Sequence, residues 1–309
     1  MTIQSPYYLA VDGGGTKTLA IIVDAQGQVC GQGTAGGANA ASIGQQKALN
    51  NIKLAVEAAI QDSDSQLSLQ AAWFGLAGVD RDHEVQTLMP HLQPLAHSVR
   101  ITNDAELALG GLDEAIGIAL IAGTGSIALG IDPDGKHARA GGWGHAIGDE
   151  GSGFDIGRQG LQAATQAADG RGEPTLLLQN ILRYWKLDKP EDIIGRVYPS
   201  EDKAEIARLS VVVFQTAREG DQRANQILEK AAQELARAVL AVYKQLDFPN
   251  DTLPLALAGG LLVHELDYQN AVLDAIRQQQ ITGQIAIVEH PALSAAQALC
   301  RLSHIAPTM

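Results

Sequence analysis

A glycine-rich segment that also carries an acid, two hydroxyls and a lysine, Asp12–Thr18, combines the residue types that bind phosphate. Glycine has no Cβ, so the backbone can approach an anion closely. Successive backbone N–H groups can then converge on phosphate oxygens, and the carboxylate of Asp12 can hold a divalent cation through its water shell. The alternative is a tight turn between two strands, which also favours glycine. The segment therefore favours a nucleotide site.

The residues after this loop determine its type. A P-loop and a dinucleotide-binding loop both run into a helix. Here residues 18–24 are apolar and β-branched, and residues 25–27 form a turn before another extended segment at 29–34. With a further strand expected at 7–11, the glycines lie in a β-hairpin. The expected phosphate-binding residues of this hairpin turn are Asp12, Gly13, Gly14, Gly15, Thr16 and Lys17.

A second copy of the hairpin lies 108 residues further along the chain. Shifting the sequence by that number places Gly15 over Gly123 and Asp24 over Asp132, and the residues between these anchors match in type. A repeated strand, turn and strand indicates two halves of one ancestral unit. The second phosphate loop is expected to use Gly123, Thr124 and Gly125.

Each half continues with helical and extended segments. The sequence predicts, in the first half, a helix at 47–60 and strands at 71–77 and 99–102, and in the second half, a helical region at 152–246 and strands at 253–258 and 285–288. The order β-β-β-α-β-α-β-α thus occurs twice, with a helical insertion in the second copy.

This pattern predicts an α/β protein with two lobes, residues 1–115 and 116–309. Ligands of α/β sheets bind at the carboxyl ends of strands. Both glycine hairpins are therefore expected to open into a cleft between the lobes.

Composition and charge exclude several classes of partner. The chain is 46% hydrophobic and carries a net charge of −13, which argues against nucleic acid and against an anionic membrane surface. The first residues, 1–5, show no export signal, so a cytoplasmic location is expected. Cys30 and Cys300 are the only cysteines and have no metal-binding spacing, so they are expected to be reduced, buried thiols.

Asp104 follows the strand expected at 99–102 and precedes a helical run at 105–109. An aspartate in this place is commonly a helix N-cap. At a strand end that faces a phosphate loop, its carboxylate could instead accept a proton from a substrate hydroxyl. We favour the general base.

Residues 141–152 form a glycine-dense stretch with several polar side chains. Long loops of this kind are commonly functional. The carboxylate of Asp149 suits adjacent sugar hydroxyls, and the indole of Trp143 could pack beside them. Alternatively, Trp143 and His145 pack the loop down, and Glu150 serves the helix that follows.

Two further loops contain candidate ligands. Gly259 and Gly260 lie between a late strand and a helix, where they allow close approach of a flat or anionic group or simply form a turn. Asn39 follows the third strand, where it could bind a hydroxyl or cap a turn.

Six motifs together resemble the N-acetylglucosamine kinase and glucosamine kinase branch of the BadF/BadG/BcrA/BcrD-type ATPase family. They are Asp-Gly-Gly-Gly-Thr-Lys-Thr at 12–18, Asn-Asp at 103–104, Gly-Thr-Gly-Ser at 123–126, Gly-Gly-Trp-Gly-His at 141–145, Gly-Asp-Glu-Gly-Ser at 148–152 and Ala-Gly-Gly at 258–260. The resemblance covers essentially the whole chain. It implies the fold of the actin, sugar kinase and Hsp70 superfamily, with two ribonuclease-H-like lobes.

The resemblance also implies roles for individual residues. Asp12, Thr16 and Thr124 would belong to the site of ATP and Mg²⁺, with Asp12 as the metal residue and Asp104 as the base. The adenosine would lie near Gly259 and Gly260. The residues that would contact the sugar, besides Asp104, are Asn39, Gly142, Trp143, Gly144 and Asp149.

The expected activity is transfer of the γ-phosphoryl group of ATP to the 6-hydroxyl of an amino sugar. Activator ATPases of the same family hold an iron–sulfur cluster with cysteines, for which this chain has no suitable pair. Two alternatives remain open: a sugar or nucleotide sensor without catalysis, and an ATPase coupled to a partner protein. The sequence does not distinguish N-acetylglucosamine from glucosamine, and a homodimer is the default expectation for the assembly.

Overall fold

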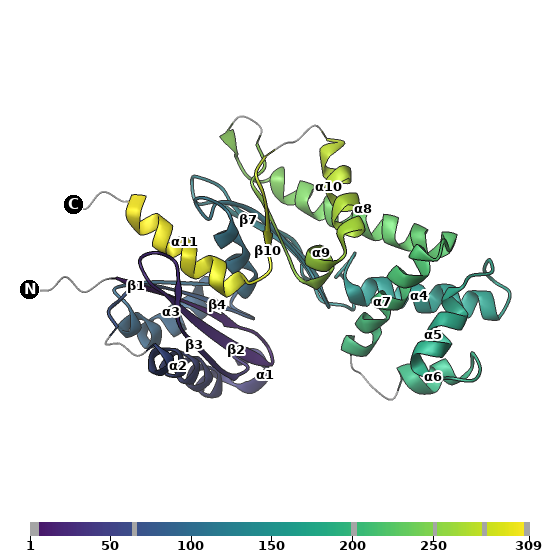
Figure 1. Ribbon diagram of the computed structural model, residues 1–309, viewed down its shortest axis with the longest axis horizontal. Helices are drawn as coiled ribbons and strands as arrows, with labels where there is room; N and C mark the ends of the chain where they lie inside the picture. The colour runs from purple at the N-terminus through teal and green to yellow at the C-terminus, as the bar shows by residue number, and fades with distance from the viewer. Residues whose placement is uncertain (1–5, 64–66, 199–202, 250–251, 280–282, 306–309) are drawn as a thin grey trace, which may run out of the picture. The chain divides into compact units, whose positions relative to one another are not determined.

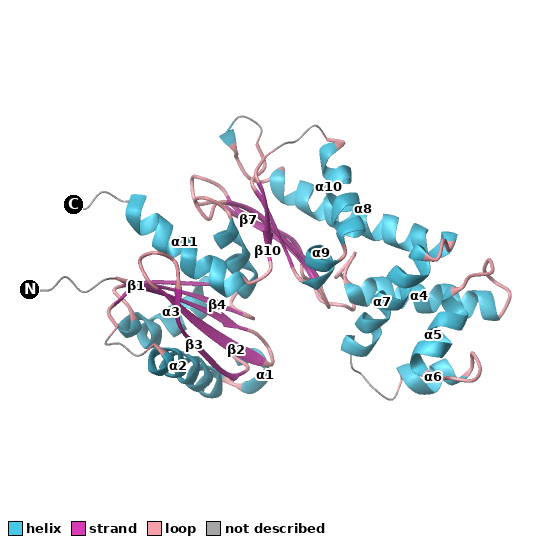
Figure 2. Cartoon of the chain, viewed as in Figure 1, coloured by secondary structure: helices cyan, strands magenta, loops and turns pink. Residues whose placement is uncertain are grey.

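The computed structural model describes residues 6–63, 67–198, 203–249, 252–279 and 283–305. The segment 1–5, in which no export signal is seen, lies outside these residues, as do 199–202 of the predicted helical region. The described strands form two mixed five-stranded sheets, and the rest of the regular structure is helical (Figure 2).

The first sheet has the strand order β3-β2-β1-β4-β5. β1 pairs antiparallel with β2 and parallel with β4, while β2 pairs antiparallel with β3, and β4 pairs parallel with β5. Its strands are β1 (Tyr7–Gly13), β2 (Lys17–Val23), β3 (Val29–Gly36), β4 (Leu69–Leu76) and β5 (Ser98–Thr102).

The second sheet has the strand order β10-β9-β6-β7-β8, and its β7 and β8 form an antiparallel pair. Its strands are β6 (Gly117–Ala122), β7 (Ser126–Ile131), β8 (His137–Gly141), β9 (Leu255–Ala258) and β10 (Ile285–Val288).

Helices follow the strands in the order that the sequence predicts. The first half contains α1 (Ala40–Ile43), α2 (Gln45–Asp62), α3 (Asp82–Leu92) and the 3₁₀ helices η1 (Gln93–Leu95) and η2 (Asp104–Gly111). The second half contains α4 (Gly153–Ala168), α5 (Leu177–Trp185), α6 (Asp192–Val197), α7 (Lys203–Arg218), α8 (Gln222–Tyr243), α9 (Gly260–His264), α10 (Leu266–Arg277) and α11 (Pro291–Ile305). The duplicated order β-β-β-α-β-α-β-α and the helical insertion are confirmed, with 3₁₀ rather than α geometry for the helix at Asp104.

The internal repeat reappears in the hairpin turns. Asp24 accepts hydrogen bonds from the backbone N–H groups of Gln26 and Gln28 at 2.8 and 2.9 Å. Asp132, 108 residues later, accepts the same pair from Asp134 and Lys136 at 3.1 and 2.9 Å. The two turns therefore have the same architecture.

Contacts divide the chain into two compact units, residues 1–119, 254–256 and 284–309 in unit 1 and residues 120–253 and 257–283 in unit 2. The predicted lobe boundary between 115 and 116 lies close to the first of these breaks and stays a prediction. The contacts differ from that division in assigning residues 116–119, 254–256 and 284–309 to unit 1, and the last of these segments includes the C-terminal helix α11. It packs on β1, β2 and β4, and the Cys300 thiol donates to the carbonyl of Ala25.

Two layers of helix enclose the first sheet, because alternate residues of a strand point to opposite faces. Leu9 and Val11 of β1 belong to a buried cluster with residues of α2 and α3. Figure 1 shows α11 on the opposite side of this sheet from α2. Tyr8 lies on the face toward α11, where the hydroxyl of Ser303 donates to its hydroxyl at 2.5 Å. Of the two thiols that the sequence predicts to be buried, Cys300 is buried and Cys30 is only partly so.

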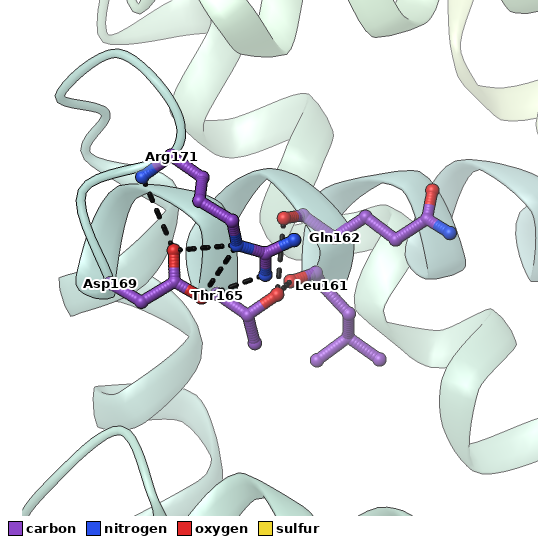
Figure 3. Close-up of polar contacts among 5 residues, drawn as sticks. All are labelled: Leu161, Gln162, Thr165, Asp169 and Arg171. Carbon is purple, nitrogen blue, oxygen red and sulfur yellow. Dashed lines mark hydrogen bonds and ion pairs between the residues drawn. The ribbon is translucent and has the colours of Figure 1, made fainter.

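The helical insertion comprises α4 to α8 in unit 2. Some of its polar contacts are local and lie at the ends of helices. After α4, the guanidinium of Arg171 donates to both carboxylate oxygens of Asp169, and the hydroxyl of Thr165 donates to two carbonyls of the preceding turn (Figure 3). An exposed pair of this kind contributes at most about 1 kcal/mol. No described helix has the length and the apolar character that crossing a membrane requires.

Close backbone packing between β3 and α2 generates a prediction. A Cβ on Gly33 would lie 2.0 Å from the carbonyl oxygen of Ala55. Gly33→Ala is therefore expected to lower the free energy of unfolding by about 1–3 kcal/mol, since α2 must move away from the strand. Urea denaturation measures the change.

Gly195, in α6, provides the control because no atom lies within 4 Å of its added Cβ. Gly195→Ala is expected to leave stability unchanged or to raise it by up to about 1 kcal/mol. Equal stabilities for Gly33→Ala and the wild type would contradict the packing argument.

Candidate active site

The predicted residues of unit 1 lie along one edge of the first sheet. β1, β4 and β5 run parallel, so their carboxyl ends share this edge. β2 runs antiparallel to β1, which places its first residue, Lys17, at the same edge, opposite Gly36 at the end of β3. The fold therefore brings together the glycine loop, Asn39 and Asp104.

Hydrogen bonds from three directions fix the first glycine loop. The N–H of Gly14 donates to the carbonyl of Lys17 at 3.0 Å, and this bond closes the turn. The carbonyl of Gly14 accepts from the N–H of Ala38, and the carbonyl of Gly13 accepts from that of Ala77, both at 2.8 Å. The hairpin turn that the sequence predicts is thus tied to the segments after β3 and β4.

One side of this loop is crowded and the other is open. A Cβ on Gly13 would lie 2.6 Å from a methyl group of Leu76, and one on Gly37 would lie 2.2 Å from the carbonyl oxygen of Gly15. By contrast, a Cβ on Gly15 would meet no atom within 4 Å, and Thr16 and Lys17 are exposed. The exposed backbone and side chains of residues 15–17 are available to a phosphate group.

Two carboxylates, Asp12 and Asp104, face this edge. Burial, and after it the negative charge of Asp104, together raise the pKa of Asp12 from 3.8 to about 6. Burial also raises the pKa of Asp104, against hydrogen bonding to backbone N–H groups that lowers it. The charges of Asp12 and Asp104 are thus close enough to repel each other, an arrangement that a cation would stabilise.

The residue that caps η2 is Asn103. Its side-chain oxygen accepts from the N–H of Ala105 at 2.9 Å, and its amide nitrogen donates to Asp80 at 2.9 Å. One oxygen of Asp104 also lies 3.0 Å from the N–H of Ala105. Because Asn103 already caps the helix, the Asp104 carboxylate is not needed for that purpose, and its role as a base stays a prediction.

Asp80 also belongs to this group, although the sequence does not mark it as a candidate site residue. Besides its contact with Asn103, its charge raises the pKa of Asp104. The available signal was its place four residues after the end of β4, at the same edge as the other acids.

Asn39 caps the start of α1, which is one of the two roles that the sequence allows. Its side-chain oxygen accepts from the N–H of Ala41 at 3.0 Å at the start of α1. The same oxygen would lie 3.2 Å from a Cβ on Gly78 in the loop after β4. Asn39 is half-buried at this edge of the sheet, and contact with a sugar hydroxyl stays a prediction.

In unit 2 the second glycine loop has a matching position between β6 and β7. The N–H of Gly123 donates to the carbonyl of Gly125 at 2.9 Å. The start of α4 binds this loop, because the N–H groups of Gly153 and Phe154 donate to the carbonyls of Gly123 and Thr124 at 2.8 and 3.2 Å. Thr124 itself is exposed.

Gly259 lies directly against this loop. Its φ is +88°, and an added Cβ would be 2.4 Å from the carbonyl oxygen of Ala122 at the end of β6. Only glycine fits such an approach without strain. The structure therefore brings Gly259 and the exposed Gly260 beside the second glycine loop, while contact with adenosine stays a prediction.

Asp149 and Trp143, both predicted to contact sugar, have different surroundings. The Asp149 side chain is buried, its φ is +62°, and its carboxylate oxygen is 3.0 Å from the position of a Cβ on Gly125. Trp143 is 68% exposed, with the guanidinium carbon of Arg139 at 5.3 Å from its ring centroid. The structure thus brings Asp149 to the second glycine loop, while Trp143 is exposed and its contact with a sugar stays a prediction.

In the glycine-dense stretch 141–152, two glycines adopt backbone conformations that favour glycine. Gly142 and Gly144 on either side of Trp143 have φ angles of +68° and +84°. The ring of His145 packs edge-on against Phe154 at 5.0 Å between centroids, as the packing alternative predicts. Glu150 does not cap α4, because the hydroxyl of Ser152 accepts from the N–H of Asp155.

Two hydroxyls, one in each hairpin, bind a backbone carbonyl at the end of the third strand or beyond it. The hydroxyl of Thr18 donates to the carbonyl of Gly36 at 2.7 Å, and that of Ser126 donates to the carbonyl of Glu150 at 2.7 Å. Thr18 and Ser126 are equivalent in the 108-residue repeat. The sequence paired them but did not indicate what they bind.

A metal ion at Asp12 would depend on ligands beyond the protein. Within the described residues, no group of three His, Cys, Asp or Glu side chains is arranged to hold a metal ion. Mg²⁺ is commonly held by one or two carboxylates together with water and substrate phosphates. A carboxylate beside an open glycine loop fits that mode.

Comparison with known proteins identifies related chains. The profile of the BadF/BadG/BcrA/BcrD ATPase family matches residues 9–297. An N-acetylmuramic acid/N-acetylglucosamine kinase of Clostridium acetobutylicum is 38% identical over 83% of this chain and 85% of its own length. An N-acetyl-D-glucosamine kinase of Dictyostelium discoideum is 33% identical over 82% of this chain and 84% of its own.

A solved structure shows the same fold. A candidate N-acetylglucosamine kinase of Chromobacterium violaceum aligns with a TM-score of 0.70 at 26% identity. The alignment covers 97% of this chain and 100% of the other. The architecture of paired mixed sheets is therefore shared along essentially the full length of both chains.

The raised pKa of Asp12 predicts a pH-dependent stability. The unfolded chain loses this proton near pH 3.8, whereas the folded chain keeps it until pH about 6. Stability therefore falls as the pH rises through this window and remains lower above it. Asp12→Asn removes the ionisation, so the variant should match the wild type at pH 4 and exceed it by about 1–2 kcal/mol at pH 7.5.

Urea unfolding at the two pH values, without added metal, measures this difference. Asp188→Asn serves as the control, because Asp188 is exposed. An Asp12→Asn variant that is no more stable than the wild type at pH 7.5 would contradict the assigned cause.

Proposed function

This chain belongs to the BadF/BadG/BcrA/BcrD ATPase family, and we propose that it is an ATP-dependent kinase that phosphorylates the 6-hydroxyl of an amino sugar. The observation that carries the proposal is the pairing of Asp12 with Asp104 beside an open glycine loop. Phosphoryl transfer to a sugar needs a cation site and a proton acceptor, and these two carboxylates suit the two tasks.

ATP use follows from the family. The first glycine loop offers the exposed Thr16 and Lys17 to phosphate oxygens, and the second offers Thr124. Mg²⁺ would be held by Asp12 together with phosphate oxygens and water, and when bound it neutralises charge on the phosphates. The base of the nucleotide would lie at Gly259 and Gly260.

Asp104 is proposed as the base that receives the proton of the attacking hydroxyl. It lies at the strand edge, its carboxylate is not needed as the helix cap, and its raised pKa makes it a stronger base than an exposed aspartate. The charge of Asp80 contributes to the raised pKa of Asp104, and the charge of Asp104 in turn raises the pKa of Asp12.

An amino sugar is favoured as substrate by the names of the relatives, which act on N-acetylmuramic acid, N-acetylglucosamine or, in the glucosamine kinase of Vibrio cholerae at 28% identity, glucosamine. Asp149 is proposed to bind adjacent sugar hydroxyls through its two carboxylate oxygens. Asn39 and the segment Gly142–Gly144 would provide further contacts.

A coupled assay for ADP tests the function. With ATP and Mg²⁺, N-acetylglucosamine or glucosamine should produce sugar-dependent ADP and a phosphorylated sugar that mass spectrometry detects, whereas glucose should react poorly. N-acetylmuramic acid and N-acetylmannosamine extend the panel. Removal of the metal with EDTA should abolish turnover, and excess Mg²⁺ should restore it.

Other outcomes would favour the alternatives. ADP release that does not depend on sugar would indicate an ATPase coupled to another protein. Binding of sugar without any phosphorylated product would indicate a sensor.

Replacing the proposed base tests its role separately. Asp104→Asn keeps the shape of the side chain but cannot accept the proton, so kcat should fall by about 10²–10⁴. Sugar binding, measured by calorimetry, should remain largely intact. Near wild-type turnover in this variant would overturn the role of Asp104, and Asp188→Asn should behave as the wild type.

A further inference from the structure

Gly151, two residues after Asp149, is held at both ends of its backbone. Its N–H donates to a carboxylate oxygen of Asp155 at 3.1 Å, and its carbonyl accepts from the hydroxyl of Tyr268 at 2.7 Å. The residue has a φ of +75°, and a Cβ here would lie 2.6 Å from the carbonyl oxygen of Ala231. This backbone position is therefore fixed by polar and steric contacts together.

Tyr268 reaches Gly151 from α10, a helix 117 residues away in sequence. Its side chain is only 3% exposed, and its ring packs edge-on against Phe214 at 5.5 Å between centroids. Burial, followed by the charge of Asp155, raises the pKa of Tyr268 well above its usual value. The hydroxyl consequently remains a donor throughout the working pH range.

The Tyr268 bond is one of three that hold successive carbonyls. The carbonyl of Asp149 accepts from the N–H of Ser152 at 3.1 Å, and that of Glu150 accepts from the hydroxyl of Ser126 at 2.7 Å. The carbonyl of Gly151 accepts from Tyr268. The bond from Ser152 closes a local turn, whereas those from Ser126 and Tyr268 join the loop to separate parts of unit 2.

These bonds bear directly on the side chain of Asp149. A φ of +62° is unfavourable for an aspartate unless its surroundings impose it. Its carboxylate lies against Gly125, where a Cβ would be 3.0 Å from one of its oxygens. The held carbonyls therefore maintain the backbone conformation that directs this carboxylate toward the second glycine loop.

We propose that Tyr268 is a positioning residue for sugar binding, acting through Gly151 to hold the loop that presents Asp149. The role in sugar binding rests on the proposed function. The hydrogen bond between Tyr268 and Gly151 is independent of that function. Tyr268 touches neither Asp149 nor either glycine loop through any hydrogen bond among the described residues, so it acts at a distance from the sugar.

Tyr268→Phe isolates the hydroxyl, because phenylalanine keeps the ring and its packing on Phe214. Tyr184→Phe is the matched control, since Tyr184 is a half-exposed tyrosine of unit 2 without a hydrogen bond among the described residues. The loss of one buried hydrogen bond that orders the loop should raise the KM for the amino sugar about 3- to 10-fold. The KM for ATP should stay within about 2-fold of the wild type.

Hydrogen–deuterium exchange of the unliganded proteins gives a second readout that does not depend on activity. In Tyr268→Phe, the amides of residues 149–153 should exchange about 3- to 10-fold faster, while those of the first sheet keep wild-type rates. Ser126→Ala, which frees the carbonyl of Glu150, should shift the same amides and the same KM. If Tyr268→Phe fails to fold, Ser126→Ala still tests whether hydrogen bonds to the carbonyls of residues 149–151 order the loop.

The outcomes separate the two proposals. Faster exchange with a raised sugar KM supports positioning, and faster exchange with unchanged KM values overturns it in favour of a purely structural bond. Unchanged exchange and unchanged KM also overturn it. A wild-type protein that phosphorylates no amino sugar would overturn the proposed function, and the exchange rates would then still decide whether the Tyr268 hydroxyl holds the loop.

Discussion

Repulsion between the carboxylates of Asp12 and Asp104 is the interaction on which the candidate site depends. Two partly buried negative charges at one sheet edge destabilise the folded state unless a proton or a cation accompanies them. The parallel arrangement of β1, β4 and β5 enforces this proximity, since their carboxyl ends share one edge. A magnesium nucleotide would supply the missing positive charge, so the feature that costs stability is also the one that favours binding.

The duplicated hairpins provide this chemistry with rigid support. Thr18 and Ser126 are equivalent hydroxyls that each bind a backbone carbonyl, and Asp24 and Asp132 close equivalent turns. The copies nevertheless hold different segments, because Thr18 fixes the chain near Asn39 and Ser126 fixes the loop of Asp149. One ancestral arrangement thus positions two different sets of polar side chains.

Local patterns made much of the fold and of the candidate site predictable from sequence. Strands, the hairpin loops and the insertion follow from hydrophobic periodicity, glycine spacing and the repeat, because each is encoded within a few neighbouring residues. The contact of Tyr268 with Gly151 could not be predicted, since nothing local marks a tyrosine that binds 117 residues away. The cap at Asn103 rather than Asp104 depends on side-chain geometry that adjacent polar residues leave ambiguous.

The packing of α11 on unit 1 has a consequence for biosynthesis. This helix covers one face of the first sheet, yet the ribosome makes it after every residue of unit 2. During translation the nascent chain must therefore carry β1, β2 and β4 with one apolar face uncovered while unit 2 emerges. Unit 1 is completed last although most of it is synthesised first, and until then its exposed face is a surface for chaperones to shield.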